Sequence, residues 1–319
     1  MSIVFISASI TVPYCLFYSS ALHYGIKQHN KTDGSSSVNN TNTEIIMKMR
    51  LALIQMAARQ RKEESLETAE HFIQKAAAEG ADIAVLPEMF NCPYANESFP
   101  LYAEPEGGES FLRMSEAASG NRIILVSGTM PERDAAARIY NTCYVFGRDG
   151  DLLAKHRKMH LFDIDIKGGQ HFMESETLSA GNEVTVFDTE FCRCGIEICY
   201  DIRFPELARL TADAGAKLIV IPAAFNMTTG PAHWELSFRA RALDNQVFMA
   251  GCSQARQEAG YISYGNSLVT SPWGDVIARM DEKEGMMITD IDLTRVDQVR
   301  DQLPLLKQRR KDIYRVERI

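Results

Sequence analysis

Residues 76–91 read AAAEGADIAVLPEMFN, and residues 211–226 repeat the pattern as TADAGAKLIVIPAAFN. Each copy holds the end of a helix, a glycine, an apolar strand, a proline and a Phe-Asn pair. A short apolar run bounded by glycine and proline is typical of a buried strand. The duplicated helix–strand unit favours two similar halves that pack face to face. A chance likeness between two ordinary helix–strand units is the alternative.

The two copies differ at the position that follows the proline. The first copy has Glu88 there, whereas the second has Ala223. A carboxylate at the end of an apolar strand costs free energy unless it is paired or used. Because the second copy does without it, the backbone does not require a carboxylate at this point. Glu88 is therefore a candidate functional residue.

Strands and helices alternate from Met49 onward, and hairpin-like strands close the series. This order indicates an α/β protein with mixed sheets. We expect helices at residues 65–78, 111–118, 205–214 and 234–245. The expected strands are residues 50–56, 82–87, 122–130, 139–147, 184–187, 194–199, 218–222, 247–253, 265–272, 275–280 and 286–293. The chain has no glycine-rich phosphate loop.

The composition is that of an ordinary soluble protein, with 45% hydrophobic and 24% charged residues among 319. The formal net charge of -8 argues against a nucleic-acid-binding surface. The seven cysteines are an odd number in apolar surroundings, so we predict reduced thiols and a cytoplasmic location, with the mitochondrion as the alternative. Cys192 and Cys194 fall on one face of a strand, but no second cysteine pair matches them, so a zinc site is not expected.

The first 48 residues differ in kind from the rest. Residues 3–24 are apolar and aromatic, but Pro13 interrupts them and no Lys or Arg precedes them, unlike a secretory signal. Residues 27–44 are polar and rich in Ser, Asn and Thr, as expected of a disordered linker. We predict a poorly ordered leader over residues 1–48, either a targeting segment or an upstream start, and a folded domain over residues 49–319.

The segment GIEICYDIRFPEL, residues 195–207, places a thiol where a strand turns into a helix. The strand ends at Cys199, and Pro205 opens the helix. The positive end of that helix and the free backbone N–H groups of the turn suit a nucleophile and an oxyanion. A buried cysteine that acts only as a small hydrophobic residue is the alternative.

A nucleophilic thiol needs a lowered pKa or an adjacent base, and the sequence offers two kinds of base. Glu88 is one, because its position is otherwise unexplained. Histidine is the usual partner, and the candidates are His160, His171 and His233. Lys158 in KHRKMHLFD precedes apolar residues and can point inwards, although a surface lysine is the common case.

Three segments in this order, VLPEMF, HRKMHLFD and GIEICYDIRFPEL, resemble the signature segments of the nitrilase, or carbon–nitrogen hydrolase, superfamily. The resemblance covers about residues 50–314 and implies a four-layer α-β-β-α sandwich of two mixed sheets with internal pseudo-twofold symmetry, assembled as a homodimer. It implies that Glu88 is the general base, Lys158 the cation that holds the oxyanion, and Cys199 the nucleophile. A second glutamate, Glu174 in FMESETLSAGN, would hold Lys158 or a substrate amine. This chemistry requires no metal and no cofactor.

Within this superfamily the chain is most similar to the omega-amidases, through MFNCPYANESFPLYAE, KMHLFDIDIKGG, AFNMTTGPAHWELSFRARALDNQVF and LPLLKQRRKDIY. The similarity implies hydrolysis of the terminal amide of 2-oxoglutaramate or 2-oxosuccinamate, through a cysteine thioester, to the 2-oxo dicarboxylate and ammonia. Such a substrate carries a free carboxylate, which we expect Arg203 to bind in a bidentate way. The other residues expected to bind substrate are Tyr94, Tyr200 (through its backbone N–H), Phe225, Asn226 and Thr228.

Several alternatives stay open. An amidase acting on deaminated glutathione, a true nitrilase or an N-carbamoyl amidase would use the same catalytic residues. A catalytically silent scaffold and a papain-like hydrolase with a histidine base are the alternatives from other classes. Glu197 alternates with Cys199 along the strand, so it either raises the thiol pKa through like charge or is paired elsewhere. The expected partner is a small-molecule amide, with no nucleic acid and, for the folded domain, no membrane.

Overall fold

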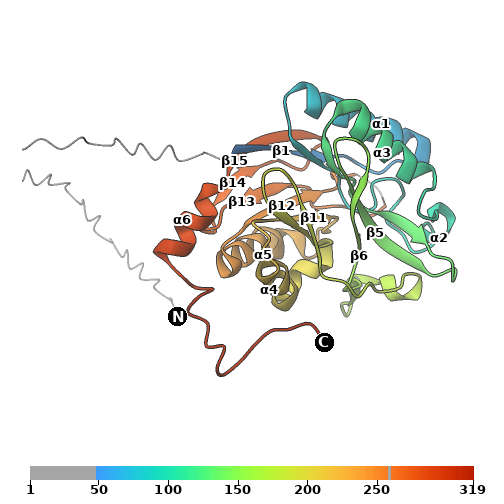
Figure 1. The fold of residues 1–319 in the computed structure, drawn as a ribbon. Coiled ribbons are helices and arrows are strands. Elements are labelled where there is room, and N and C mark those ends of the chain that lie inside the picture. Colours follow the sequence, from blue (N-terminus) through green and yellow to red (C-terminus); the bar gives the residue numbers. More distant parts are fainter. Residues whose placement is uncertain (1–47, 258–259) are drawn as a thin grey trace, which may run out of the picture. The chain divides into compact units, whose positions relative to one another are not determined.

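The computed structural model describes residues 48–257 and 260–319, and Figure 1 shows the fold. The predicted leader lies outside the described residues, except that Lys48 begins the first strand. Within the part of the chain that the structure describes, no helix has both the length and the hydropathy needed to cross a membrane.

The first sheet has seven strands in the order β15-β1-β2-β3-β5-β4, with β6 also paired to β5. Its strands are β1 (Lys48–Gln55), β2 (Ile83–Val85), β3 (Ile124–Val126), β4 (Met130–Arg133), β5 (Ile139–Phe146), β6 (Leu152–Arg157) and β15 (Gly285–Asp292). The three strands β1, β2 and β3 run parallel, and antiparallel strands flank them on both sides.

The second sheet has six strands in the order β14-β13-β12-β11-β10-β9. These are β9 (Thr185–Asp188), β10 (Arg193–Ile196), β11 (Leu218–Ala223), β12 (Phe248–Ser253), β13 (Leu268–Thr270) and β14 (Val276–Arg279). Strands β10, β11 and β12 run parallel, again between antiparallel neighbours. Both sheets therefore have the same order of strand pairings: antiparallel, parallel, parallel, antiparallel and antiparallel. This holds along β15-β1-β2-β3-β5-β6 in the first sheet and along β9-β10-β11-β12-β13-β14 in the second, which confirms the internal symmetry suggested by the repeat.

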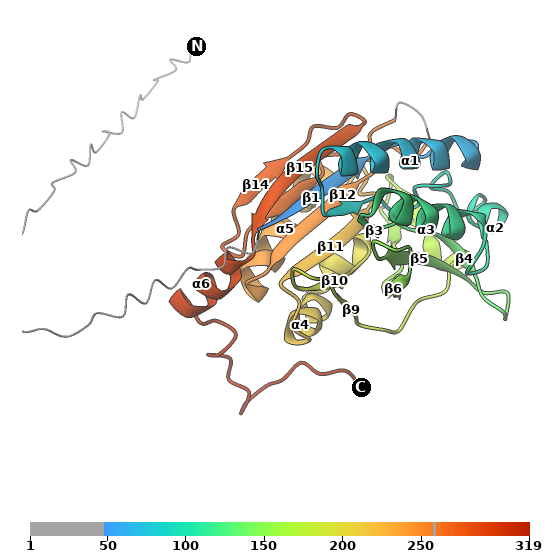
Figure 2. The same ribbon diagram turned by 45° about the horizontal axis from the view of Figure 1, so that its top comes forward.

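The helices cover the outer faces of the two sheets. Helices α1 (Lys62–Ala78) and α3 (Glu109–Asn121) pack on the first sheet, whereas α4 (Pro205–Asp213) and α5 (Gly230–Asn245) pack on the second (Figures 1 and 2). A large apolar cluster fills the space between the sheets and joins residues such as Leu53 and Val85 to Val220 and Met249. The four layers confirm the predicted α-β-β-α sandwich.

Apolar spacing explains why these helices form where they do. In α1, Leu66, Ala69, Ile73 and Ala76 are buried, at the spacing of one helix face.

Helix α5 begins at Gly230, four residues before the predicted start, because Pro231 is well tolerated in a first helical turn. The short helices α2 (Phe99–Tyr102) and α6 (Thr294–Gln302) were not predicted.

A small hairpin of β7 (Asp163–Asp165) and β8 (His171–Met173) was also not predicted. It matters for the site because Glu174 follows β8 directly. Glu88 is the third residue after β2 and directly follows Pro87, and Lys158 directly follows β6. The ends of separate strands thus place three charged side chains near one another.

Close packing of α4 on β10 requires a glycine. A Cβ atom on Gly195 would lie 2.1 Å from Cγ2 of Thr211. The Thr211 hydroxyl donates a hydrogen bond of 2.9 Å to the Leu207 carbonyl, which limits how far this side chain can turn away. Gly195 therefore fixes the distance between the helix and the strand that leads to Cys199.

We expect Gly195→Ala to lower the free energy of unfolding by about 1–3 kcal/mol through overpacking, as measured by urea unfolding. Thr211→Ser removes the clashing Cγ2 methyl but keeps the hydroxyl. The double variant should therefore recover most of the loss caused by Gly195→Ala. A double variant as unstable as the sum of the two single variants would contradict this account.

Candidate active site

Cys199 lies where β10 gives way to a short 3-10 helix, η2 (Cys199–Arg203). Its φ of 46° is in the left-handed region, which a non-glycine residue adopts only when the surrounding structure holds it there. Its exposed fraction is 5%. The backbone N–H of Tyr200, in the first turn of η2, has no acceptor among the described residues. The turn therefore presents a thiol next to a free donor.

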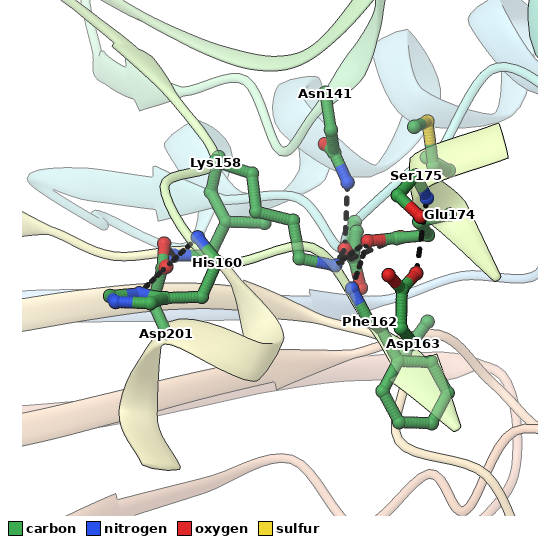
Figure 3. Close-up of polar contacts among 12 residues, drawn as sticks. Asn141, Lys158, His160, Phe162, Asp163, Glu174, Ser175 and Asp201 are labelled. Carbon is green, nitrogen blue, oxygen red and sulfur yellow. Dashed lines mark hydrogen bonds and ion pairs between the residues drawn. The ribbon is translucent and has the colours of Figure 1, made fainter. Parts of the chain in front are cut away.

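Lys158 is fully buried between two carboxylates. Its Nζ lies 2.9 Å from Oε1 of Glu88, and 2.9 Å and 2.8 Å from the two oxygens of Glu174. Figure 3 shows Lys158 and Asn141 directed toward this cluster of carboxylates. Burial alone lowers the pKa of Lys158, but Glu174 and Glu88 more than offset it, so the pKa lies above its usual value. Lys158 therefore keeps its positive charge.

Glu88 has two oxygens in different surroundings. Oε1 accepts hydrogen bonds from Lys158 and from Nδ2 of Asn141 at 2.8 Å, and the Tyr94 hydroxyl oxygen lies 3.2 Å from it. Oε2 is buried and has no hydrogen-bond partner among the described residues. One oxygen is thus held in place while the other remains able to accept a proton.

The Cys199 thiol is protonated in this environment. Burial raises its pKa, the negative charge of Glu88 raises it further, and Lys158 opposes the shift only in part. The Cys199 thiol must lose its proton before it can attack, and the free oxygen of Glu88 can accept that proton. This is the arrangement that general-base activation requires.

Glu174 and Tyr94 complete the buried cluster. Oε2 of Glu174 accepts the Phe162 backbone N–H at 2.6 Å, and Oε1 accepts the Tyr94 hydroxyl at 2.5 Å. Burial raises the pKa of Glu174, and Lys158 opposes that shift. Tyr94, predicted to line the substrate pocket, is not among the residues that line the pocket at Cys199, and its ring stacks on that of Tyr261 with centroids 4.4 Å apart. Its contacts orient the catalytic carboxylates.

A pocket opens beside the thiol. It is lined by Phe162, Cys199, Tyr200, Arg203, Ala224, Phe225, Asn226, Thr229 and Tyr261. Four of the residues predicted to bind substrate are therefore present. Thr228 is exposed and does not line the pocket, whereas its neighbour Thr229 does. The Thr228 backbone N–H donates to Oδ1 of Asn226 at 3.1 Å, so Thr228 shapes the turn.

Arg203 brings a positive charge to this pocket. Its Cζ lies 4.7 Å from the ring centroid of Phe225 and 5.5 Å from that of Tyr200. Nη1 lies 2.8 Å from Nδ1 of His233, and Nε is buried without a partner. Burial lowers the pKa of Arg203. Among the described residues no carboxylate pairs with it, so the guanidinium can bind an anion that enters the pocket.

The candidate histidines are engaged elsewhere. Nδ1 of His160 lies 2.8 Å from Oδ1 of Asp201, and the His160 ring stacks on Phe204 at 3.7 Å. His233 contacts Arg203, and the exposed His171 lies 3.3 Å from Asp165. These contacts leave Glu88 as the base that the geometry supports.

Sequence reasoning missed two supporting residues. Asn141 orients Glu88 through a hydrogen bond. Its place inside the apolar run IYNTCYVF could have identified it, because a buried amide needs a hydrogen-bond partner. Asp201 accepts the backbone N–H of Ile198 at 3.0 Å and that of His160 at 2.8 Å, which ties η2 to the Lys158 segment (Figure 3). Burial opposes ionisation of Asp201, but hydrogen bonds from His156 and His160 lower its pKa.

Glu197 is fully buried, and neither carboxylate oxygen has a hydrogen-bond partner among the described residues. Burial, with a smaller effect of the Asp201 charge, raises its pKa to about 8, while Arg241 opposes the shift. The charges that act most on the Cys199 thiol are Glu88 and Lys158. Glu197 therefore keeps its proton to a higher pH than an exposed glutamate does.

The raised pKa of Glu197 predicts a loss of stability at alkaline pH. Between about pH 4.5 and pH 8 the folded state keeps a proton that the unfolded state has released, so the free energy of unfolding falls as pH rises through this window. Glu197→Gln cannot lose that proton. Between pH 5 and pH 9 we expect the free energy of unfolding of the wild type to fall relative to that of Glu197→Gln, by on the order of 3–5 kcal/mol. Urea unfolding at both pH values measures this difference.

The exposed residue Glu116 provides the matched control for this measurement. Glu116→Gln should show the same pH dependence as the wild type. Parallel stability curves for wild type and Glu197→Gln would mean that Glu197 is ionised in the folded protein.

Among the described residues, no group of three His, Cys, Asp or Glu side chains is arranged to hold a metal ion.

Comparisons with known proteins give one consistent family. The carbon-nitrogen hydrolase profile matches residues 50–301. Omega-amidase NIT2 of Xenopus tropicalis is 52% identical over 271 residues, which cover 85% of this chain and 98% of the relative. Omega-amidase NIT2 of Homo sapiens is 51% identical, covering 84% of this chain and 97% of the relative. The crystal structure of Saccharomyces cerevisiae Nit3, a member of the nitrilase superfamily, matches with a TM-score of 0.76 and 42% identity, covering 82% of this chain and 97% of that one.

Proposed function

We propose that this chain, which belongs to the carbon–nitrogen hydrolase family, is an omega-amidase that hydrolyses the terminal amide of 2-oxoglutaramate or 2-oxosuccinamate. The observation that carries the proposal is the pairing of a Glu88–Lys158–Cys199 centre with Arg203, a cation without a carboxylate partner among the described residues, in the same pocket. Similarity over most of the chain to relatives named omega-amidase supports it.

Acylation begins when Glu88 takes the thiol proton and the sulfur of Cys199 attacks the amide carbonyl carbon. The developing oxyanion is stabilised by the Lys158 ammonium and the Tyr200 backbone N–H, which is free at the start of η2. The C–N bond then breaks, and protonated Glu88 gives its proton to the leaving nitrogen. Ammonia departs, and a thioester remains on Cys199.

Deacylation uses the same groups in the same order. Glu88 takes a proton from water as the water oxygen attacks the thioester carbonyl. The oxyanion returns to the same donors, the C–S bond breaks, and Glu88 returns the proton to the sulfur. The acid is released and Cys199 is restored. Glu174 and Tyr94 keep Lys158 in place throughout, because both contact its Nζ.

The pocket suits a short substrate with a terminal carboxylate. Arg203 presents its guanidinium near the rings of Tyr200 and Phe225, which shield it from water on two sides. A planar guanidinium matches a carboxylate through two parallel hydrogen bonds. Asn226 also lines the pocket, and its Nδ2 donates a hydrogen bond of 2.6 Å to Oε1 of Gln170.

We further propose that the protein works as a homodimer through α5. Leu236 and Leu243 are seven residues apart and therefore lie on one face of this helix. Their exposed fractions are 67% and 40%. Trp273 is 45% exposed, and the next residue, Gly274, accepts a hydrogen bond of 2.8 Å from Nε of Arg239 in the same helix. An apolar surface of this kind marks an interaction site. The cytoplasmic location stays a prediction.

The first test is ammonia release from 2-oxoglutaramate, with deaminated glutathione and a simple nitrile as comparison substrates. We expect rapid release that is lost in Cys199→Ala and reduced about 10²- to 10⁴-fold in Glu88→Gln. His171→Ala, which changes an exposed histidine, should behave as the wild type. Preferred turnover of a comparison substrate would overturn the substrate assignment, and an active Glu88→Gln would overturn the base.

The role of Arg203 has a separate test. Arg203→Gln should lower kcat/KM for 2-oxoglutaramate about 10- to 100-fold. A loss of this size corresponds to the free energy of one or two charged hydrogen bonds to the substrate carboxylate. Turnover of a matched amide with a methyl group in place of the carboxylate should change little. Arg122→Gln, which alters an arginine paired with Asp149 on the surface, is the control. An equal loss for both amides would show that Arg203 acts on the fold of the site instead.

A further inference from the structure

Two thiols lie close together where the turn after β9 enters β10, away from the proposed chemistry. Sγ of Cys192 lies 3.7 Å from Sγ of Cys194, and the two atoms are within hydrogen-bond distance. Cys194 is fully buried in the core between the sheets, whereas Cys192 is partly exposed at the end of the turn. Neither thiol lines the pocket beside Cys199.

Cys192 differs from the other described cysteines. Burial raises the pKa of Cys92, Cys143 and Cys252, so these thiols are unreactive. The hydrogen bond from Cys194 lowers the pKa of Cys192; burial opposes the shift, and the positive charge of Lys217 adds to it. Among the described cysteines, Cys192 is the one that is not buried, and it has a second thiol within 3.7 Å.

We propose that Cys192 and Cys194 are a reversible oxidation site for hydroperoxides. The Cys192 thiolate attacks the terminal peroxide oxygen, the O–O bond breaks, and the alcohol or water leaves with a proton, so that Cys192 becomes a sulfenic acid. The Cys194 thiol then attacks the Cys192 sulfur, an S–S bond forms, and the S–O bond breaks to release water. The two thiols lose two electrons and two protons, and the peroxide is reduced.

The geometry permits this closure with a local change. The sulfur atoms must approach from 3.7 Å to about 2.05 Å. Residues two apart along an extended strand have Cα atoms about 6.7 Å apart, near the upper end of what a disulfide spans. Cys192 precedes β10 and belongs to the turn, so it can move toward Cys194 while the strand pairing of Cys194 is kept.

Hydrogen bonds within the turn oppose formation of the disulfide. The Cys192 backbone N–H donates to the Thr189 hydroxyl oxygen at 3.1 Å, and the Thr189 N–H and hydroxyl donate to the Cys192 carbonyl at 3.1 Å and 2.8 Å. Movement of Cys192 strains these bonds. A strained and partly exposed disulfide is readily reduced, so the modification is reversible by thiols.

The experiment uses the full chain, treated with hydrogen peroxide, blocked with N-ethylmaleimide and cleaved by trypsin without reduction. Trypsin cleaves after Arg193, between the two cysteines, so a disulfide leaves two peptides joined. We expect peptides 168–193 and 194–203 as one linked species that separates on reduction with dithiothreitol. Peptide 194–203 also carries Cys199, so the same linkage must form in Cys199→Ala.

Single variants test the order of the two steps. Cys194→Ser should abolish the linked peptides and increase labelling of Cys192 by dimedone, a sulfenic-acid reagent, several-fold over the wild type. Cys192→Ser should abolish both signals, and Cys143→Ser, which alters a buried thiol, should change neither. Linkage that disappears in Cys199→Ala, or oxidation of Cys192 without linkage to Cys194, would overturn the proposal.

Discussion

The buried ion cluster of Lys158 with Glu88 and Glu174 is the constraint on which the rest of the structure depends. All three side chains are fully buried, so each charge needs a partner at hydrogen-bond distance. The three residues follow different strands, β2, β6 and β8, and the cluster holds only if these strand ends keep their positions. Asn141 and Tyr94 add donors from two further segments. Catalytic geometry and correct folding thus rest on the same contacts.

The duplicated helix–strand unit explains how a symmetric scaffold holds an asymmetric site. After its proline, the first copy has Glu88, which is bound to Lys158. The second copy has Ala223 at that position, and its last three residues, 224–226, line the pocket beside Cys199. The same backbone position therefore provides the base in one half and leads into the substrate wall in the other. Because the alanine side chain is small, it leaves room where the first copy places a carboxylate.

Much of the sandwich was predictable because its strands are apolar runs bounded by glycine and proline. The hairpin of β7 and β8 was not, since its strands have three residues each, which is too few to reveal a period in the sequence. Glu88, Lys158 and Cys199 were identified from motifs, and the structure brings Glu88 and Lys158 into contact. Asn141, Asp201 and the orienting position of Tyr94 depend on contacts between distant segments, which a local pattern does not reveal. The choice between Thr228 and Thr229 depends on the shape of one turn.

The pairing of one ammonium with two carboxylates affects how a catalytic cycle ends. An amide carries no charge at its reacting end, so it can enter beside Glu88 and Glu174 without repulsion. Hydrolysis turns that end into a carboxylate, a third negative charge around the single ammonium of Lys158. Like charges at such distances repel strongly where water is scarce. Under the proposed function, the reaction thus creates the charge that expels its own product, and the acid is a poor inhibitor of the enzyme that makes it.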